Sequence, residues 1–157
     1  MMGRVLLRYA GGLADLKEMS RRMVLNVLMG NGDAHIKNWS LIYDNPVRPR
    51  LAPAYDLVST VACMANDTSL ALNMGGVKPF ESITLDTFAT FLTRVGLSDQ
   101  VHAEVMEDVR LTGQRVLTLW RDQFVAWGVP QKLIQRLELH QQRLPLAVSL
   151  VAHWYRA

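Results

Sequence analysis

The sequence has very little cysteine, no block of like charges and no long apolar stretch. Cys63 is its only cysteine, so an internal disulfide framework and a cysteine-based zinc site are both excluded. Because Val61, Ala62 and Met64 around it are apolar, we expect Cys63 to be a small buried residue. No stretch approaches the ~18 uncharged apolar residues of a membrane helix, and the first residues do not resemble a secretion signal. These absences predict a cytoplasmic protein.

Charged residues are scattered along the chain. The 17 basic and 14 acidic residues give a net charge of +3, and there is no basic arm of the kind that binds nucleic acid or anionic membranes. We therefore expect no direct nucleic-acid or membrane contact, although a small helical nucleic-acid binder remains a rival suggested by the basic charge. Half of the 157 residues are hydrophobic, which is typical of one globular domain with a substantial core.

Apolar periodicity predicts a mainly helical protein, with one hairpin in its first third. Helices are predicted over residues 13–29, 84–96 and 98–128, and from 131 to the end with a break at Pro145. Short strands are predicted over 39–43, 50–52 and 69–73, the first two forming the hairpin. A short helix is expected directly after Asp56. Residues 84–157 thus form a helical bundle, and the unusual polar residues all precede it.

Three polar side chains stand at the two ends of the predicted hairpin. Asp33 and Asn38 lie in the loop before it, and Asp56 follows its return strand. Strand pairing should bring Asn38 and Asp56 together. Carboxylate and amide oxygens suit Mg²⁺. Phosphoryl transfer needs one aspartate as base, with an asparagine and a second aspartate on the metal, and protein kinases separate the base and the asparagine by four residues, as here.

Each part of this pattern also has an ordinary structural interpretation. The Gly30–Asp33 run is typical of a helix-to-strand turn, and Asp56 could cap the helix after it. His35 could orient the catalytic aspartate or touch a phosphate, or could bond the backbone; Lys37 could neutralise a γ-phosphate or be solvated. The two parts in order, joined by a hairpin-length spacer, favour a site.

The remaining histidines and the tryptophans of the second half give no site. The histidines are too far apart to form a helical metal pair: His102, His140 and His153. The tryptophans are expected to pack in the core or between helices: Trp120, Trp127 and Trp154.

Two long motifs carry a resemblance to a known family. Residues 26–41, with the central run Gly-Asn-Gly-Asp-Ala-His-Ile-Lys-Asn, resemble the catalytic loop of HipA-type serine/threonine protein kinases. Residues 51–60, with Ala-Pro-Ala-Tyr-Asp-Leu-Val-Ser-Thr, resemble the metal-binding signature of the same family. The resemblance is strongest over residues 14–77, and the rest of the chain is compatible with the C-terminal lobe.

The resemblance implies a kinase-like, mainly α C-terminal lobe in which a small antiparallel hairpin carries the catalytic loop and the metal-binding aspartate. It implies that Asp33 is the catalytic base and that Asn38 and Asp56 bind Mg²⁺. ATP would be the phosphoryl donor and a protein serine or threonine the acceptor. HipA-type toxins belong to toxin–antitoxin systems, are linked to persistence, and are typically neutralised by a DNA-binding HipB-type antitoxin.

The family's ATP-binding N-terminal lobe, with its phosphate loop and nucleotide lysine, has no counterpart in these residues. We therefore expect residues 1–157 to be a catalytic-lobe fragment, truncated relative to the family, with weak ATP binding and no activity unless another chain completes it. The alternative is a non-enzymatic module that binds an antitoxin or another kinase half. The face that an N-lobe would cover should be closed by a homodimer, by another protein, or by the segment 5–9.

Overall fold

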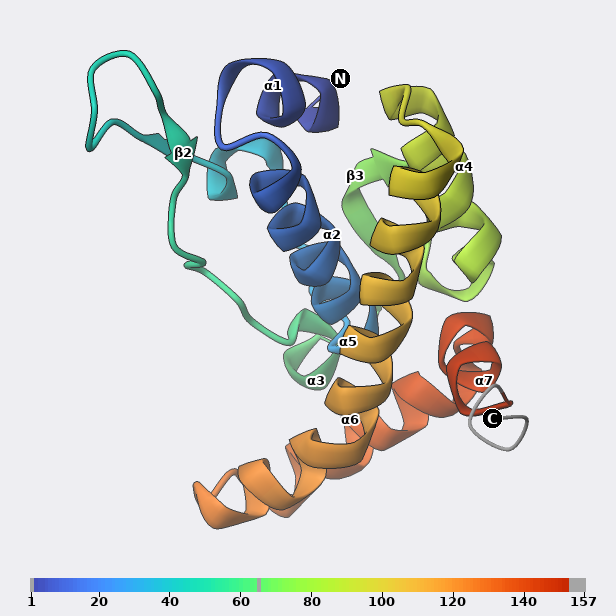
Figure 1. Ribbon diagram of the computed structural model, residues 1–157. Helices are drawn as coiled ribbons and strands as arrows, with labels where there is room; N and C mark the ends of the chain where they lie inside the picture. The colour runs from blue at the N-terminus through green and yellow to red at the C-terminus, as the bar shows by residue number, and fades with distance from the viewer. Residues whose placement is uncertain (1, 65, 153–157) are drawn as a thin grey trace.

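The computed structural model describes residues 2–64 and 66–152, which are mainly helical with two small antiparallel sheets (Figure 1). The helices are α1 (Met2–Tyr9), α2 (Leu13–Leu28), α3 (Thr60–Cys63), α4 (Leu85–Val95), α5 (Asp99–Ala126), α6 (Gln131–Arg143) and α7 (Pro145–Ala152), with 3-10 turns at Ile36–Asn38 and Phe80–Ser82. Strand β1 (Leu41–Ile42) pairs with β2 (Arg50–Leu51), and β3 (Ser69–Met74) pairs with β4 (Val77–Pro79). The predicted helical fold with a hairpin after the polar loop is therefore confirmed.

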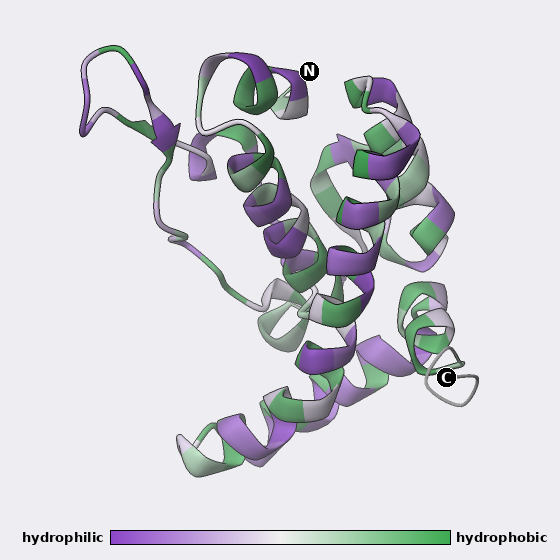
Figure 2. Ribbon diagram, viewed as in Figure 1, coloured by the Kyte–Doolittle hydropathy of each residue, from purple (hydrophilic) through white to green (hydrophobic). Residues whose placement is uncertain are grey.

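The core forms where α2 packs along the long helix α5. Apolar residues recur every three or four positions on both helices, and Figure 2 shows hydrophobic and hydrophilic segments alternating along them. Val24 and Val27 of α2 and Val105 and Val109 of α5 are completely buried. Burying a side chain of this size stabilises the fold by roughly 1.5–3 kcal/mol. This packing fixes the C-terminal end of α2, from which the polar loop departs.

Polar caps start the helices of the bundle where the sequence predicts. The Thr84 hydroxyl accepts the backbone N–H of Thr87 in a reciprocal capping box at the start of α4. Ser98 accepts the backbone N–H of Val101 at the start of α5. These bonds satisfy amides that have no partner within the helix. Gly96, with a φ of 89°, ends α4 in the left-handed conformation that glycine adopts freely.

Helix α1 was not predicted as a helix. Its Leu6 is 2% exposed and packs with Met19 and Leu51, whereas Tyr9 is 69% exposed. The segment 5–9 therefore packs on α2 and β2 through the buried side chain of Leu6. Figure 1 shows α1 resting above the N-terminal end of α2.

Three further expectations differ from the structure. The predicted helix after Asp56 begins only at Thr60, and residues 57–59 before it have no regular secondary structure. Cys63 is exposed, which corrects the expectation of a buried thiol, because α3 ends there and presents it to solvent. Trp127 is 70% exposed rather than packed, whereas Trp120 is buried. His153 and Trp154 lie outside the described residues. No helix within 2–64 and 66–152 is long and apolar enough to cross a membrane.

His140 of α6 is packed against the rest of the core. Its ring meets that of Phe80 edge-on at 5.1 Å between centroids, and its Nε2 atom donates to the carbonyl oxygen of Val27 over 2.9 Å. Burial lowers the pKa of His140 below the ordinary value of 6.5. The hydrogen bond and the carboxylates of Asp67 and Glu81 oppose this shift, and neighbouring Arg143 adds to it.

The lowered pKa of His140 predicts a loss of stability in mild acid. Because the unfolded chain binds a proton below pH 6.5 more readily than the folded chain, the free energy of unfolding should fall as the pH drops from there towards about 5. We expect His140→Gln, which does not titrate, to remove this part of the pH dependence. Urea unfolding of both proteins at several pH values measures it, and parallel curves for the two would contradict the prediction.

Candidate functional site

The predicted site residues lie together beyond the C-terminal end of α2. Asn38 ends the 3-10 turn before β1, and Asp56 lies in the segment after β2. The β1–β2 pairing, with Leu41 opposite Leu51, returns the chain to its starting point. As a result the Asn38 amide nitrogen lies 2.8 Å from the Asp56 carboxylate. The hairpin spacer therefore does bring these two side chains into contact.

The Asn38 amide links both aspartates. Its Nδ2 atom donates to the Asp56 carboxylate over 2.8 Å and to the backbone carbonyl of Asp33 over 3.0 Å. With its nitrogen committed to both, the amide oxygen accepts no hydrogen bond from the described part of the chain. An unused amide oxygen beside an exposed carboxylate is a donor set that suits Mg²⁺, which takes few protein ligands and keeps waters. The residues fit such an ion.

These residues would supply only some of the ligands of a bound metal ion. Among residues 2–64 and 66–152, no cluster of three or more histidine, cysteine, aspartate or glutamate side chains could hold a metal. The Asp56 carboxylate and the Asn38 amide meet the needs of Mg²⁺ only when phosphate oxygens and waters complete the shell.

Asp56 has an unusual backbone conformation. Its φ of 55° is the only positive value for a non-glycine residue in the described ranges. This left-handed conformation costs roughly 1–2 kcal/mol for an ordinary residue and less for aspartate. The Asn31 side chain holds it, because Nδ2 of Asn31 donates to the Asp56 carbonyl over 3.3 Å. Such strain persists only where the surroundings enforce it, and it is common at functional sites.

Asn31 is the buried centre of the loop, with only 2% of its surface exposed. Besides Asp56, its Nδ2 atom contacts the Asn26 amide oxygen at 3.1 Å. Its Oδ1 atom accepts the backbone N–H of Asp33 at 3.1 Å. One side chain therefore fixes the backbone of both aspartates relative to α2.

Thr60 holds the turn before Asp33. Its hydroxyl oxygen accepts the backbone N–H of Gly32 over 2.8 Å, and the hydroxyl proton faces the Gly30 carbonyl and the Asp67 carboxylate. A Cβ atom on Gly32 would lie 2.1 Å from an Asp67 oxygen, so any side chain there would displace the Asp67 carboxylate from Thr60. The start of α3 thus grips the turn, and the backbone N–H of Val61 adds a bond to the Gly30 carbonyl.

The end of the loop near Lys37 is held by Tyr55, which lies in the same segment as Asp56 and Thr60. The Tyr55 hydroxyl donates to the backbone carbonyl of Lys37 over 2.8 Å and contacts the Ser40 hydroxyl. Residues 55–60 therefore contact the loop at both ends as well as at Asn38. The two sequence motifs form one hydrogen-bonded unit.

Comparison with known proteins agrees with this pairing of motifs. Residues 1–116 match the HipA-like C-terminal domain. The chain belongs to this family. It is 34% identical over 146 residues, or 93% of its length, to the protein named "Putative kinase Y4dM" from Sinorhizobium fredii. It is 44% identical over 62 residues to a protein named "Putative kinase" from Haemophilus influenzae. It spans only 35% and 18% of these two relatives.

A solved HipA structure has the same fold. This HipA from Shewanella oneidensis, in a complex with HipB and operator DNA, aligns with 97% of the chain at a TM-score of 0.57 and 22% identity. The chain spans 32% of that protein. At this identity the likeness establishes the fold of the HipA-like domain and no more.

Asp33 and Lys37 of the HipA-like loop are open to solvent, and His35 is half-buried. The Asp33 side chain is 58% exposed, and the Nε2 atom of His35 lies 3.8 Å from its carboxylate. Nδ1 of His35 is buried and, within the described ranges, has no hydrogen-bond partner. Lys37 is exposed. The carboxylate that the family resemblance makes the base is thus free to meet an incoming group.

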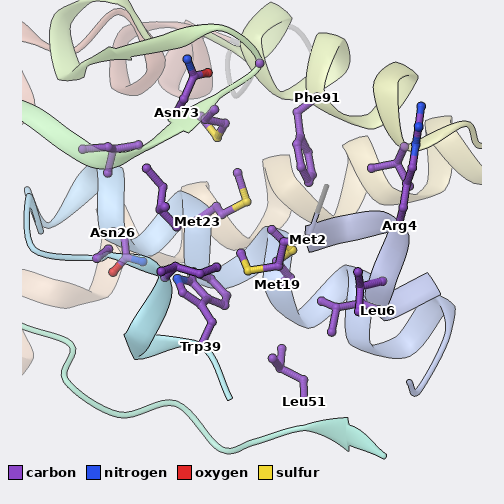
Figure 3. A pocket seen from close by; sticks show the side chains of 18 of the residues that line it. Met2, Arg4, Leu6, Met19, Met23, Asn26, Trp39, Leu51, Asn73 and Phe91 are labelled. Atoms are coloured by element: carbon purple, nitrogen blue, oxygen red, sulfur yellow. The ribbon is translucent and has the colours of Figure 1, made fainter. Parts of the chain in front are cut away.

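An apolar cavity of about 540 Å³ adjoins the loop (Figure 3). Its walls come from α1, α2, β2, β3 and α4, and the loop contributes Ala34, Ile36 and Trp39. Met19, Met23 and Phe91 give it a soft apolar lining that Figure 3 displays around Trp39. The buried Nε1 atom of Trp39 has no partner in the part of the chain that the structure describes.

Sequence reasoning missed the residues that hold the loop. Asn31, Tyr55 and Thr60 lie inside the two motifs, but nothing in their spacing separates a residue that binds the backbone from one that meets solvent. The Gly-Asn-Gly sequence was the available signal, because two glycines around a buried amide indicate a backbone held tightly on both sides.

The hydrogen bond between Thr60 and the turn before Asp33 predicts that replacing Thr60 lowers the free energy of unfolding. Thr60→Val removes the acceptor of the Gly32 amide in a buried place, so we expect a cost of about 1–3 kcal/mol. Thr93→Val is the control, because Thr93 also bonds a backbone carbonyl but is exposed in α4; about 0.5 kcal/mol or less is expected there. Urea unfolding compares the two, and equal losses would contradict the role of Thr60.

Proposed function

We propose that this chain is the catalytic-lobe part of a HipA-type serine/threonine protein kinase, which transfers the γ-phosphoryl group of ATP to a protein hydroxyl. The observation that carries the proposal is the Asn38 amide, which bonds the Asp33 backbone and the Asp56 carboxylate at once. That contact joins a base, an amide oxygen and a metal-binding carboxylate from two motifs in the order that protein kinases use.

The side chains have distinct tasks in the proposed reaction. The exposed Asp33 carboxylate accepts the proton of the attacking hydroxyl, and Asn31 keeps its backbone in position. The Asn38 oxygen and the Asp56 carboxylate hold Mg²⁺, which supplies charge neutralisation for the phosphates when bound. Lys37 adds positive charge beside the transferred group, and His35, whose Nε2 atom lies 3.8 Å from the Asp33 carboxylate, orients that aspartate or contacts a phosphate. ATP as donor assigns the reaction to the cytoplasm.

The nucleotide needs more contacts than this lobe offers. The matched residues span 35% and 20% of two family relatives, and in kinases the phosphate loop and the nucleotide lysine lie in the N-lobe. We propose that an equivalent N-lobe segment, from the same or another polypeptide, completes the ATP site over the loop. Residues 1–157 alone are then inactive, because ATP is not positioned for transfer.

Calorimetric titration with ATP tests the part of the proposed ATP site that residues 1–157 contain. We expect a dissociation constant on the order of 1 mM, or about −4.1 kcal/mol, that is measurable only with Mg²⁺ because the remaining contacts are metal-mediated. Asp56→Asn should abolish binding, whereas Asp122→Asn, on the exposed face of α5, should not change it. Micromolar binding without Mg²⁺ would show that ATP occupies another pocket.

A chimera tests the chemistry itself. Residues 1–157 replace the corresponding lobe of the Sinorhizobium relative, and autophosphorylation is followed with radiolabelled ATP. Asp33→Asn should reduce the rate at least about 10²-fold, since it removes the general base, while leaving Mg²⁺-dependent ATP binding intact. Full activity of Asp33→Asn would remove Asp33 from the mechanism.

A second candidate is a non-enzymatic module that binds a HipB-type antitoxin or another kinase half. Apolar openings on two sides favour it: the cavity of about 540 Å³, and a groove of about 910 Å³ between α2 and α5 that Trp120 and Trp127 line. Large exposed apolar surfaces mark interaction sites. If partner binding persists in Asp33→Asn and the chimera has no activity even with Asp33 present, the module is the better description.

A further inference from the structure

Helix α6 bonds backbone carbonyls on both sides of the site. Nε2 of His140 donates to the carbonyl of Val27 over 2.9 Å, and Nε2 of Gln141 donates to the carbonyl of Leu28 over 3.1 Å. Nη1 of Arg136 donates to the carbonyl of Ala62 over 2.8 Å. Three donors on one helix thus reach three carbonyls in two other helices.

These carbonyls occupy corresponding places in α2 and α3. Val27 and Leu28 are the last residues of α2, from which the loop of Asp33 departs, and Ala62 is in the last turn of α3, which follows Asp56. Carbonyls in the last turn of a helix lack partners within it. The backbone N–H of Gly30 already contacts the Val27 carbonyl over 3.2 Å, so His140 adds a second bond there. Gln141 and Arg136 donate to the carbonyls of Leu28 and Ala62.

The contacts are wholly or partly removed from water. Gln141 is 9% exposed, and the His140 ring lies against Phe80. Gly30 has a φ of 61°, and a Cβ atom on it would lie 2.3 Å from the Val61 side chain and 3.0 Å from Nε2 of His140, so the packing of α3 and α6 around it favours glycine. Hydrogen bonds in such an environment fix geometry more tightly than exposed ones.

We propose that α6 is a brace which sets the position of the catalytic loop relative to the Asp56 segment, with His140 and Arg136 as its two arms and as positioning residues. His140 fixes the end of α2 and Arg136 fixes α3, whose first residue, Thr60, grips Gly32. The brace lies outside the matched residues 1–116, so it is a feature of this chain that the family match does not describe. Its effect on metal affinity rests on the proposed function, whereas its effect on the loop does not.

A brace and ordinary helix packing predict different consequences of mutation. Packing acts through global stability, so any change that loosens α6 equally should affect the loop equally. A brace acts through the hydrogen bonds that its side chains donate to carbonyls of α2 and α3. Only loss of the donor at His140 or Arg136 should then loosen the loop while the chain stays folded. Arg121→Met provides the comparison, because Arg121 pairs with Glu138 of α6 from α5 and touches neither carbonyl.

The experiment measures amide hydrogen exchange at Gly32 and Asp33 in residues 1–157, under conditions in which every variant is folded. The donor-loss variants are His140→Leu and Arg136→Met, and the conservative variants are His140→Gln and Arg136→Lys, which keep a donor. Losing one hydrogen bond should speed exchange at these amides about threefold to tenfold. Arg121→Met should not change it, and the conservative variants should restore it. His140 and Arg136 are tested separately. If the His140→Leu protein does not fold, Arg136→Met still tests the brace.

Mn²⁺ affinity, measured by titration with the metal alone, is the second readout. Donor-loss variants should bind Mn²⁺ about threefold to tenfold more weakly, if each lost bond contributes its usual net free energy to site geometry. Absence of Mn²⁺ binding in the unchanged chain would refute the proposed metal site, while the exchange rates would still decide on the brace. Equal exchange in Arg121→Met and the donor-loss variants, or no rescue by either conservative variant, would overturn the brace.

Discussion

The hydrogen bond between the Thr60 hydroxyl and the backbone N–H of Gly32 is the contact on which the site depends. It joins positions 28 residues apart in the sequence and ties the turn before Asp33 to the segment after Asp56. Asn31 adds the second tie, to the Asp56 carbonyl. Both contacts are partly buried, where an unmade hydrogen bond is costly. These contacts couple the loop of Asp33 to the Asp56 segment.

A rigid backbone beneath open side chains would suit the phosphoryl transfer proposed above. The loop backbone is bonded at Gly32, Asp33 and Lys37, whereas the Asp33 carboxylate stays mostly exposed. Preorganised groups need no rearrangement when charge develops during a reaction, which is the main contribution of a protein to phosphoryl transfer. The same openness means that the lobe cannot exclude water by itself, in keeping with a site that another segment completes.

Local signals in the sequence account for most of the fold. Thr84, Ser98 and Gly96 mark helix ends by caps that depend only on neighbouring residues, so these boundaries could be predicted. The convergence of Asn38 and Asp56 could be predicted as well, because a hairpin of known length determines it. The left-handed backbone conformation of Asp56 could not be predicted from a sequence pattern, because the side-chain amide of the distant Asn31 holds it in place.

Long-range contacts explain what the sequence did not reveal. His140 and Arg136 are unremarkable on an amphipathic helix until α6 is seen to meet the ends of α2 and α3. Helix α1 has only eight residues, and Leu6 is its one buried leucine. Its apolar residues Met2, Val5, Leu6 and Tyr9 do have the spacing of an amphipathic helix, so this element could have been predicted. Trp127 and Cys63 were expected to be buried by residue type alone, but each lies at a helix end that the bundle leaves exposed.

The central claim is that Asn38 and Asp56 form one metal site beside Asp33. Titration of residues 1–157 with Mn²⁺, followed by paramagnetic broadening in NMR spectra, tests it most directly. The account predicts that the side-chain amide signal of Asn38 and the backbone amides of Asp33 and Asp56 broaden first and together, and that Mg²⁺ competes for the site. Broadening elsewhere in the chain, with these three residues unaffected, would contradict the account.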